Sequence, residues 1–227
     1  MKTLFIEAKS DLKVKLSPEV LEKIKKETSN IGLFTTVQFF DNLDALKKQL
    51  SDTGIEVKLF LGPHSKYEGQ ILGCTIMKFD CSAFLYIGDG KFHPEALVIK
   101  NQEKPVFCYD PFKRKLEYLD RIAIDKGMKK QKAGLTHFYS KQKIGVIVST
   151  KPGQFHLRKA RELKKKFPTK KFFIFIGNTI DFDQLENFPF IEAWVNTACP
   201  RISYTDNMKF PKPVCDIDEV LEMERAR

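Results

Sequence analysis

The sequence predicts an α/β fold made of two similar small domains, each a parallel sheet with flanking helices. Short apolar runs alternate with longer amphipathic segments, which is the pattern of parallel strands covered by helices. A strand, a glycine-containing turn and a helix recur in the same order in the second half of the chain. Hydrophobic residues make up 42% of the 227 residues, enough for sizeable cores. We place the boundary near residue 135, which gives domains of residues 1–134 and 135–227.

The first domain alternates predicted strands and helices up to Tyr109. Ser17 as N-cap and Pro18 at the first helical position mark the start of one helix, and Gly54 follows the end of another. The predicted strands are 3–7, 31–38, 56–60, 83–87 and 105–109, and the predicted helices are 18–28, 42–53 and 93–99. Residues 114–137 are charged, helix-like and poor in turns, and we interpret them as a long connecting segment.

The second domain repeats this alternation of predicted strands and helices. Strands are predicted over 143–149, 171–176 and 192–196, and helices over 155–166 and 181–186. Ligands of open α/β sheets bind beyond the carboxyl ends of the strands. The segments of interest by that rule are 35–38, 73–74, 88–94, 110–111, 149–154 and 196–201.

Charge and composition exclude several classes of protein. The net charge is +10, but lysines outnumber arginines 32 to 7, whereas proteins that read nucleic acids usually rely on arginine. We therefore expect no nucleic-acid partner, although the positive net charge is still compatible with an acidic partner of another kind. No apolar run approaches the roughly 18 residues of a spanning helix. Residues 1–9 are too briefly apolar and too soon acidic for a secretory signal, so we expect a cytoplasmic protein without a membrane partner.

The five cysteines lie at positions 74, 81, 108, 199 and 215, an odd number without a CxxC pair, which indicates reduced thiols. Cys81, Cys108 and Cys215 lie in or beside apolar segments, where a free cysteine commonly acts as a small buried hydrophobe. Cys74 and Cys199 lie in probable loops, where a thiolate could bind a soft metal. The residues alone leave burial open as the alternative for both.

Two other loops could carry chemistry. His93 follows the GDGKF segment and could be a base, a ligand or an anion contact, or simply a first-turn residue that caps backbone groups. Lys151 and Gln154 flank Pro152-Gly153 before a helix, which is either an anion or carboxylate site or an ordinary turn. GDG does not match a nucleotide-binding glycine motif, and no catalytic triad, carboxylate pair or HExxH motif is present. The sequence therefore names no catalytic residue.

Seven segments occur in an order that resembles one family. They are FIEAKSD, IGLFTTVQ, YEGQILGCT, FLYIGDGKFHP, YDPF, IVSTKPGQ and VNTACPRI. Together they are similar to the second and third domains of the diphthamide biosynthesis enzyme family, whose archaeal member is a 3-amino-3-carboxypropyl transferase. The resemblance extends from Phe5 to about Pro213, nearly the whole chain.

The resemblance implies a radical enzyme. Members hold a 4Fe-4S cluster through three cysteines, one from each of three similar α/β domains, and S-adenosylmethionine binds the open iron. The 3-amino-3-carboxypropyl group is then placed on a histidine of translation elongation factor 2. By this resemblance Cys74 and Cys199 are cluster ligands. The S-adenosylmethionine site would take Lys151, Gly153 and Gln154, with Asp89, Gly90, His93 and Asn196 lining the same crevice.

The family's first domain, with its cysteine, has no counterpart here, since Met1 falls where the second domain would begin. None of the other three cysteines lies in a motif like the absent one. We therefore expect a subunit of a split enzyme, in which a separate first-domain protein supplies the third thiolate. The alternatives are a non-catalytic paralogue that supports a homologous catalytic subunit, and a ligand-binding module without redox chemistry.

Overall fold

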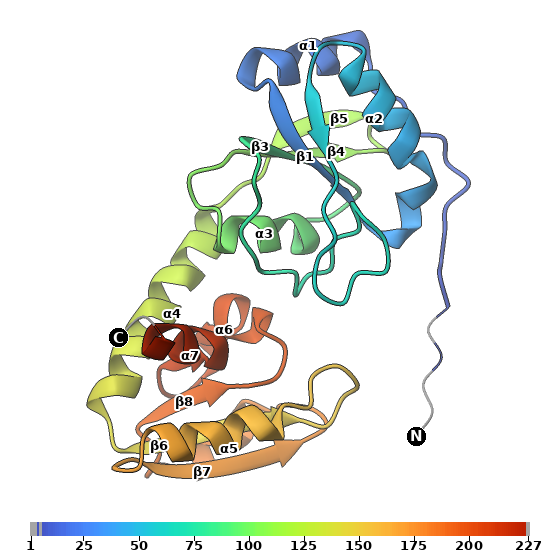
Figure 1. The fold of residues 1–227 in the computed structure, drawn as a ribbon. Helices are drawn as coiled ribbons and strands as arrows, with labels where there is room; N and C mark the ends of the chain where they lie inside the picture. The colour runs from blue at the N-terminus through green and yellow to red at the C-terminus, as the bar shows by residue number, and fades with distance from the viewer. Residues whose placement is uncertain (1–3, 5, 226–227) are drawn as a thin grey trace. The chain divides into compact units, whose positions relative to one another are not determined.

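The computed structural model describes Leu4 and residues 6–225, which divide into two compact units (Figure 1). The first unit extends to Arg121 and the second begins at Ile122. Each contains one largely parallel sheet with helices packed on it, which confirms the predicted α/β fold class. The division lies before helix α4 (Ile122–Ser140) and not near residue 135, because residues that we assigned to a connecting segment form this helix.

The first unit holds a five-stranded sheet. Its strands are β1 (Asn30–Thr35), β2 (Glu56–Lys58), β3 (Ala83–Ile87), β4 (Val106–Asp110) and β5 (Lys115–Tyr118). They lie in the order β2-β1-β3-β4-β5, and every neighbouring pair is parallel apart from β4 and β5. The helices are α1 (Pro18–Glu27), the 3-10 helix η1 (Val37–Asn42), α2 (Leu43–Ser51) and α3 (Phe92–Ile99).

Side chains alternate along β1 and β3, so both faces of this sheet are apolar. Leu33 and Leu85 lie on the face that packs against Ile24 of α1 and Leu46 of α2. Tyr86 lies on the opposite face, where its ring stacks on a histidine of α3. Figure 1 shows α2 and α3 on opposite sides of the sheet. The carboxyl ends of β1 and β3 therefore lie between two helical layers.

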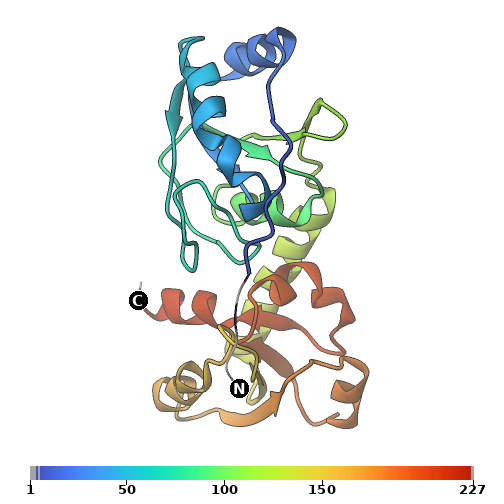
Figure 2. The same cartoon turned by 90° about the vertical axis from the view of Figure 1, so that its right-hand side faces the viewer.

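The second unit repeats this topology. Its strands β6 (Lys143–Ser149), β7 (Lys171–Gly177), β8 (Ala193–Asn196) and β9 (Val214–Asp216) form a parallel sheet in the order β7-β6-β8-β9. Counted within each unit, the order is second, first, third, fourth in both sheets. The remaining helices are α5 (Leu157–Lys166), η2 (Asp183–Asn187), α6 (Arg201–Thr205), η3 (Asn207–Lys209) and α7 (Ile217–Arg225), and Figure 2 gives the view at right angles.

Helix α4 packs into the second unit through glycines that lie directly against backbone. A Cβ at Gly127 would meet the carbonyl oxygen of Tyr204, and a Cβ at Gly134 would meet the carbonyl oxygen of Val214 in β9. Asn207 ties the helix down further, since its Nδ2 donates to the carbonyl of Gly127 at 2.8 Å. This close approach explains why α4 belongs to the second unit.

Most predicted elements are present, with several corrections. Leu4 and Ile6 are 83% and 84% exposed and lie in no strand, so the buried strand predicted over residues 3–7 is wrong there. Residues 3 and 5 lie outside the described residues. The strand predicted over 31–38 ends at Thr35, and the helix predicted over 181–186 is the 3-10 helix η2. Strands β5 and β9 and helices α6 and α7 are additional to the predicted elements.

Among the described residues, no helix has the length and apolar character needed to cross a membrane.

Candidate functional site

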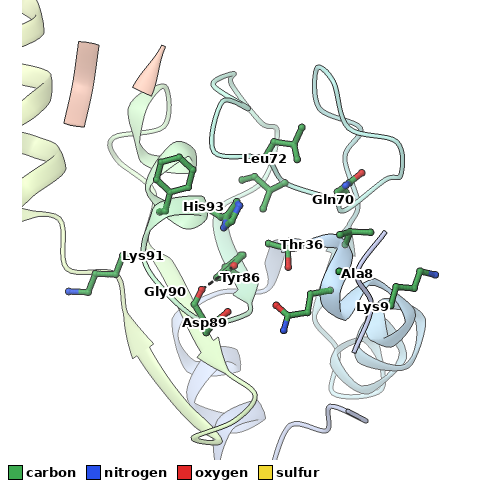
Figure 3. Close-up of a pocket in the computed structure, with 14 residues that line it drawn as sticks. Ala8, Lys9, Thr36, Gln70, Leu72, Tyr86, Asp89, Gly90, Lys91 and His93 are labelled. Carbon is green, nitrogen blue, oxygen red and sulfur yellow. Dashed lines mark hydrogen bonds between the residues drawn. The ribbon is translucent and has the colours of Figure 1, made fainter. Parts of the chain in front are cut away.

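The first unit contains a cavity of about 660 Å³ where β1 and β3 end (Figure 3). This position agrees with the rule that open α/β sheets bind ligands beyond the carboxyl ends of their strands. The cavity is lined by Ala8, Lys9, Thr36, Val37, Gln38, Gln70, Ile71, Leu72, Tyr86, Asp89, Gly90, Lys91, Phe92 and His93. Its volume lies within the range of roughly 300–1,000 Å³ that small-molecule sites occupy.

One wall of the cavity comes from the loop that precedes β3. Thr35, the last residue of β1, donates its backbone N–H to the carbonyl of Gly69 and accepts from the N–H of Ile71, both at 2.8 Å. These two bonds lay the loop alongside the end of the strand as a short parallel bridge between Thr35 and Gln70. Gln70 and Leu72 are thereby brought beside Thr36.

The opposite wall comes from the turn after β3. Gly88 has φ 155° and Gly90 has φ 71°, backbone conformations that other residues rarely adopt. A Cβ at Gly88 would lie 2.5 Å from the hydroxyl of Tyr86. That hydroxyl donates to the carbonyl of Asp89 at 3.4 Å, as the dashed line in Figure 3 shows. Burial raises the pKa of Tyr86, so the phenol remains a neutral donor.

Aromatic rings surround His93 at the start of α3. The His93 ring stacks on Tyr86 with centroids 6.4 Å apart and planes 20° apart, and Phe92 meets it edge-on at 5.4 Å. Asp89, Gly90 and His93, which the family resemblance placed in one crevice, all line this cavity. A flat apolar surface beside a carboxylate and an imidazole could bind a planar ring that carries polar edges.

Two lysines reach the cavity, and both form ion pairs. Lys9 lies 2.7 Å from Asp41, and Lys91 lies 3.4 Å from Asp120. All four side chains are largely solvated, so these pairs contribute little to stability. The rim of the cavity therefore carries exposed, nearly balanced charge.

Cys74 lies in the loop that forms the first wall. Its thiol is half-buried, and burial raises its pKa, an effect opposed by a bond to its own backbone. The loop is held by the buried side chain of Thr75, whose Oγ1 accepts the N–H of Leu72 at 3.1 Å. The neighbouring Gly73 is covered by the ring of Phe92, since a Cβ there would lie 2.6 Å from Cζ. Cys74 thus lies in a fixed loop, two residues after the lining residue Leu72.

Cys199, also half-buried, follows β8 in the second unit. Asn196 at the end of β8 is fully buried, and its Nδ2 donates to the carbonyl of Cys199 at 2.9 Å. Its Oδ1 accepts the N–H of Ala198 at 3.0 Å. The family resemblance placed Asn196 in a ligand crevice; its amide is buried here and holds the cysteine loop.

Lys151, Gly153 and Gln154 lie in the turn after β6. Gly153 has φ 75°, and Gln154 donates its N–H to the carbonyl of Lys151 at 3.0 Å, which closes the turn. Lys151 and Gly153 are exposed, and Gln154 is half-buried. Helix α5 begins at Leu157, beyond this turn, so its N-terminus does not start at the turn itself.

The donor set fits an iron–sulfur cluster only in part. Cys81 and Cys215 are buried, as predicted, while Cys108 is half-buried within β4. Burial raises the pKa of Cys108 to about 12, which keeps that thiol protonated. Within the part of the chain that the structure describes, no three His, Cys, Asp or Glu side chains are grouped to hold a metal. Each unit offers one accessible thiol in a loop at the carboxyl side of its sheet, so each fits as a single thiolate ligand.

Several lining residues were outside the predicted site. Thr36 and Gln38 follow β1. Residues 35–38 were a segment of interest only because they follow a strand, and neither side chain was predicted to bind a ligand. Gln70 and Leu72 carried no such signal, because they follow no strand and reach the cavity only through the bridge to Thr35. Tyr86 looked like an ordinary strand residue.

Comparison with known proteins shows what this chain is similar to. Residues 1–224 match the family described as diphthamide synthesis protein. The chain is 32% identical over 224 residues to the 2-(3-amino-3-carboxypropyl)histidine synthase of Pyrococcus horikoshii, which covers 96% of this chain and 64% of that protein. It is 34% identical over 190 residues to subunit 1 of the synthase of that name from Caenorhabditis elegans, which covers 79% of this chain and 47% of that protein.

A solved structure agrees with these relatives. The crystal structure of Dph2 from Pyrococcus horikoshii with a 4Fe-4S cluster superposes with a TM-score of 0.74 at 31% identity. The match covers 92% of this chain and 61% of that chain. The present chain therefore spans less than two thirds of these relatives' length.

Proposed function

Since the chain belongs to the family of diphthamide synthesis proteins, we propose that it is part of a 2-(3-amino-3-carboxypropyl)histidine synthase. The reaction would transfer the 3-amino-3-carboxypropyl group of S-adenosylmethionine to a histidine of translation elongation factor 2, in the cytoplasm. The observation that carries the proposal is the pair of half-buried thiols, Cys74 and Cys199, one in a sheet-end loop of each unit.

These two thiols are the proposed ligands of a 4Fe-4S cluster. Held by these two thiolates and a third, such a cluster would supply the electron that breaks the bond between sulfur and the γ-carbon. The described residues provide two such thiolates and no third beside either of them. We therefore infer that the third comes from outside these residues, from a separate protein in the split-enzyme interpretation.

The cavity of the first unit is the proposed place for part of S-adenosylmethionine. The stacked rings of Tyr86 and His93 offer a face on which a planar base could lie, and Asp89 offers a carboxylate for its polar edge. The turn at Gly90 brings the backbone close to that space.

In the second unit, the turn after β6 is the proposed contact for the amino acid part. Lys151 is exposed and carries the positive charge that a carboxylate needs, while Gln154 can offer an amide. Gly153 permits the tight turn that places both side chains on one loop. Asn196 is not one of these proposed ligand contacts, because its amide holds the Cys199 loop.

Iron and acid-labile sulfide content after anaerobic reconstitution tests this proposal. We expect iron in the wild-type protein mixed with a first-domain protein of the family, and its loss in both Cys74→Ala and Cys199→Ala. Cys108→Ala is the matched control, because that thiol is also half-buried yet lies inside a strand. The mass of the iron-loaded assembly shows which chain supplies the third thiolate.

Other outcomes would favour other functions. Iron-free protein that associates with a complete homologue would indicate a supporting, non-catalytic subunit. Colourless protein that still binds S-adenosylmethionine would indicate a binding module without redox chemistry. Iron content that neither cysteine substitution changes would overturn the assignment of both ligands.

A further inference from the structure

The loop that carries Cys199 is held by a line of buried polar side chains. Asn196 is fully buried, and its Nδ2 donates both to the carbonyl of Cys199 at 2.9 Å and to the Oγ of Ser203 at 3.0 Å. The Oγ of Ser203, also fully buried, donates in turn to the Oδ2 of Asp216 at 3.4 Å. The other carboxylate oxygen of Asp216 accepts the N–H of Asp218 at the start of α7 at 3.0 Å.

Both polar atoms of the Asn196 amide bond to backbone groups of the Cys199 loop. Its Oδ1 accepts the N–H of Ala198 at 3.0 Å, while its Nδ2 donates to the carbonyl of the following residue, Cys199. Only a side chain with a donor and an acceptor on one short stem can make both bonds. The Cys199 carbonyl also accepts the N–H of Ile202 at 3.1 Å, so the cysteine is held between β8 and α6.

The first unit holds its cysteine in a different way. Thr75, next to Cys74, accepts the N–H of Leu72, and the carbonyl of Cys74 accepts the N–H of Ile76 at 2.9 Å. All of these bonds are local to the loop. The line from Asn196 to Asp216 instead joins three elements, β8, α6 and β9, and therefore couples the Cys199 loop to the core of its unit.

We propose that Asn196, Ser203 and Asp216 are positioning residues for Cys199, which fix where its thiol lies. This inference rests on the proposed role of Cys199 as a cluster ligand. A thiolate ligand must be presented in one orientation, and groups that orient ligands from behind usually matter for metal affinity. Buried polar groups that are all bonded give such rigidity, whereas breaking the line leaves an unsatisfied partner.

The test is the rate at which iodoacetamide alkylates each cysteine of the apo protein, followed by peptide mass spectrometry. In Asn196→Ala we expect Cys199 to react about tenfold faster than in wild type, because two bonds that close its loop are lost. Ser203→Ala removes both bonds of the Ser203 hydroxyl, to Asn196 and to Asp216, but leaves the two bonds that close the loop, so it should give a smaller rise. Cys74 in the same sample serves as an internal reference, and its rate should stay within twofold of the wild-type rate.

Thr197→Val is the matched control. Thr197 is buried in the same loop and its Oγ1 donates to the carbonyl of Ile147 at 2.8 Å, away from Cys199. That carbonyl keeps the N–H of Thr197 as a donor, so the variant loses one buried bond without opening the cysteine loop. We expect no change in Cys199 alkylation there.

Two results would overturn the proposal. Unchanged Cys199 alkylation in both Asn196→Ala and Ser203→Ala would show that the line does not hold the loop. An equal rise in Thr197→Val would show a general structural effect. If Asn196→Ala does not fold, Asn196→Asp replaces it, because Asp keeps the acceptor for Ala198 and loses the donor.

A second readout separates this inference from the function on which it rests. In reconstituted protein, a chelator should remove iron faster from Asn196→Ala and Ser203→Ala than from wild type or Thr197→Val. If wild type binds no iron under any condition, the proposed function fails. The alkylation rates of the apo protein still decide whether these side chains position Cys199.

Discussion

Replacing Gly134 by Ala should destabilise the second unit, although alanine is the better helix former. The new Cβ would fall on the carbonyl oxygen of Val214, within 2.5 Å of its carbonyl carbon and 3.2 Å from the backbone N of Cys215. These are backbone atoms of β9, so no rotamer change relieves the contact. Overpacking of this kind costs up to about 3 kcal/mol, and the gain in helix propensity returns about 1 kcal/mol. We expect a net loss of about 2 kcal/mol in the free energy of unfolding.

Urea denaturation followed by tryptophan fluorescence measures this loss. Trp194, the single tryptophan, is buried in β8 and so reports on the second unit. The control is Ala133→Gly at the exposed neighbouring position, which should cost about 1 kcal/mol through propensity alone. If Gly134→Ala instead stabilised the unit by that same amount, α4 would not pack against β9.

Three further predictions concern single groups. Burial raises the pKa of Asp216 from 3.8 to about 7, so the folded state holds a proton that the unfolded state has released between these values. The free energy of unfolding should therefore fall as pH rises through that window, by at most about 1.4 kcal/mol per pH unit, and Asp216→Asn should flatten the slope. Cys108, with a pKa of about 12, and fully buried Cys215 should be alkylated far more slowly than a free thiol at pH 8. Ser17→Ala should cost about 1 kcal/mol, because Ser17 Oγ caps α1 by accepting the N–H of Val20; thermal unfolding of the variant measures the loss.

Each of these three predictions would be contradicted by a specific result. An identical pH slope in wild type and Asp216→Asn would remove that carboxyl as the source. Alkylation of Cys108 as fast as that of a small-molecule thiol would mean that burial does not raise the pKa of this thiol. Unchanged thermal stability of Ser17→Ala would mean that the cap contributes nothing.

Strands buried on both faces were the easiest elements to predict. The runs that form β3 and β6 are continuously apolar, because helices or aromatic side chains cover both sides of a parallel sheet. Strand β5 escaped prediction because it is a short antiparallel edge strand with alternate charged residues. Its signal was the Asx turn before it, where Asp110 accepts the N–H groups of Phe112 and Lys113.

The helical character of residues 114–137 is confirmed by α4, but its packing into the second unit was not predicted, because its contact stripe is partly glycine. Its buried positions include Ile124, Gly127, Gln131, Gly134 and Phe138, which recur at helical spacing. Large apolar residues would have made that stripe obvious, but close backbone packing excludes them here.

The candidate site was predictable in its strand-end segments and not in its walls. The segments after β1 and β3 follow from a general rule of α/β sheets. The approach of Gln70 to Thr36 depends instead on hydrogen bonds made at Thr35, and local sequence does not encode that pairing. Likewise, nothing in the sequence distinguished an amide that lines a crevice from one that holds a loop at Asn196.

The most direct test of the account is the electron paramagnetic resonance spectrum of the reconstituted protein after reduction with dithionite, in complex with a first-domain protein of the family. The account predicts a reduced-cluster signal in wild type and in Cys108→Ala, and its loss in both Cys74→Ala and Cys199→Ala. A signal of full intensity in either of those two variants would contradict the claim that each unit supplies one cluster ligand.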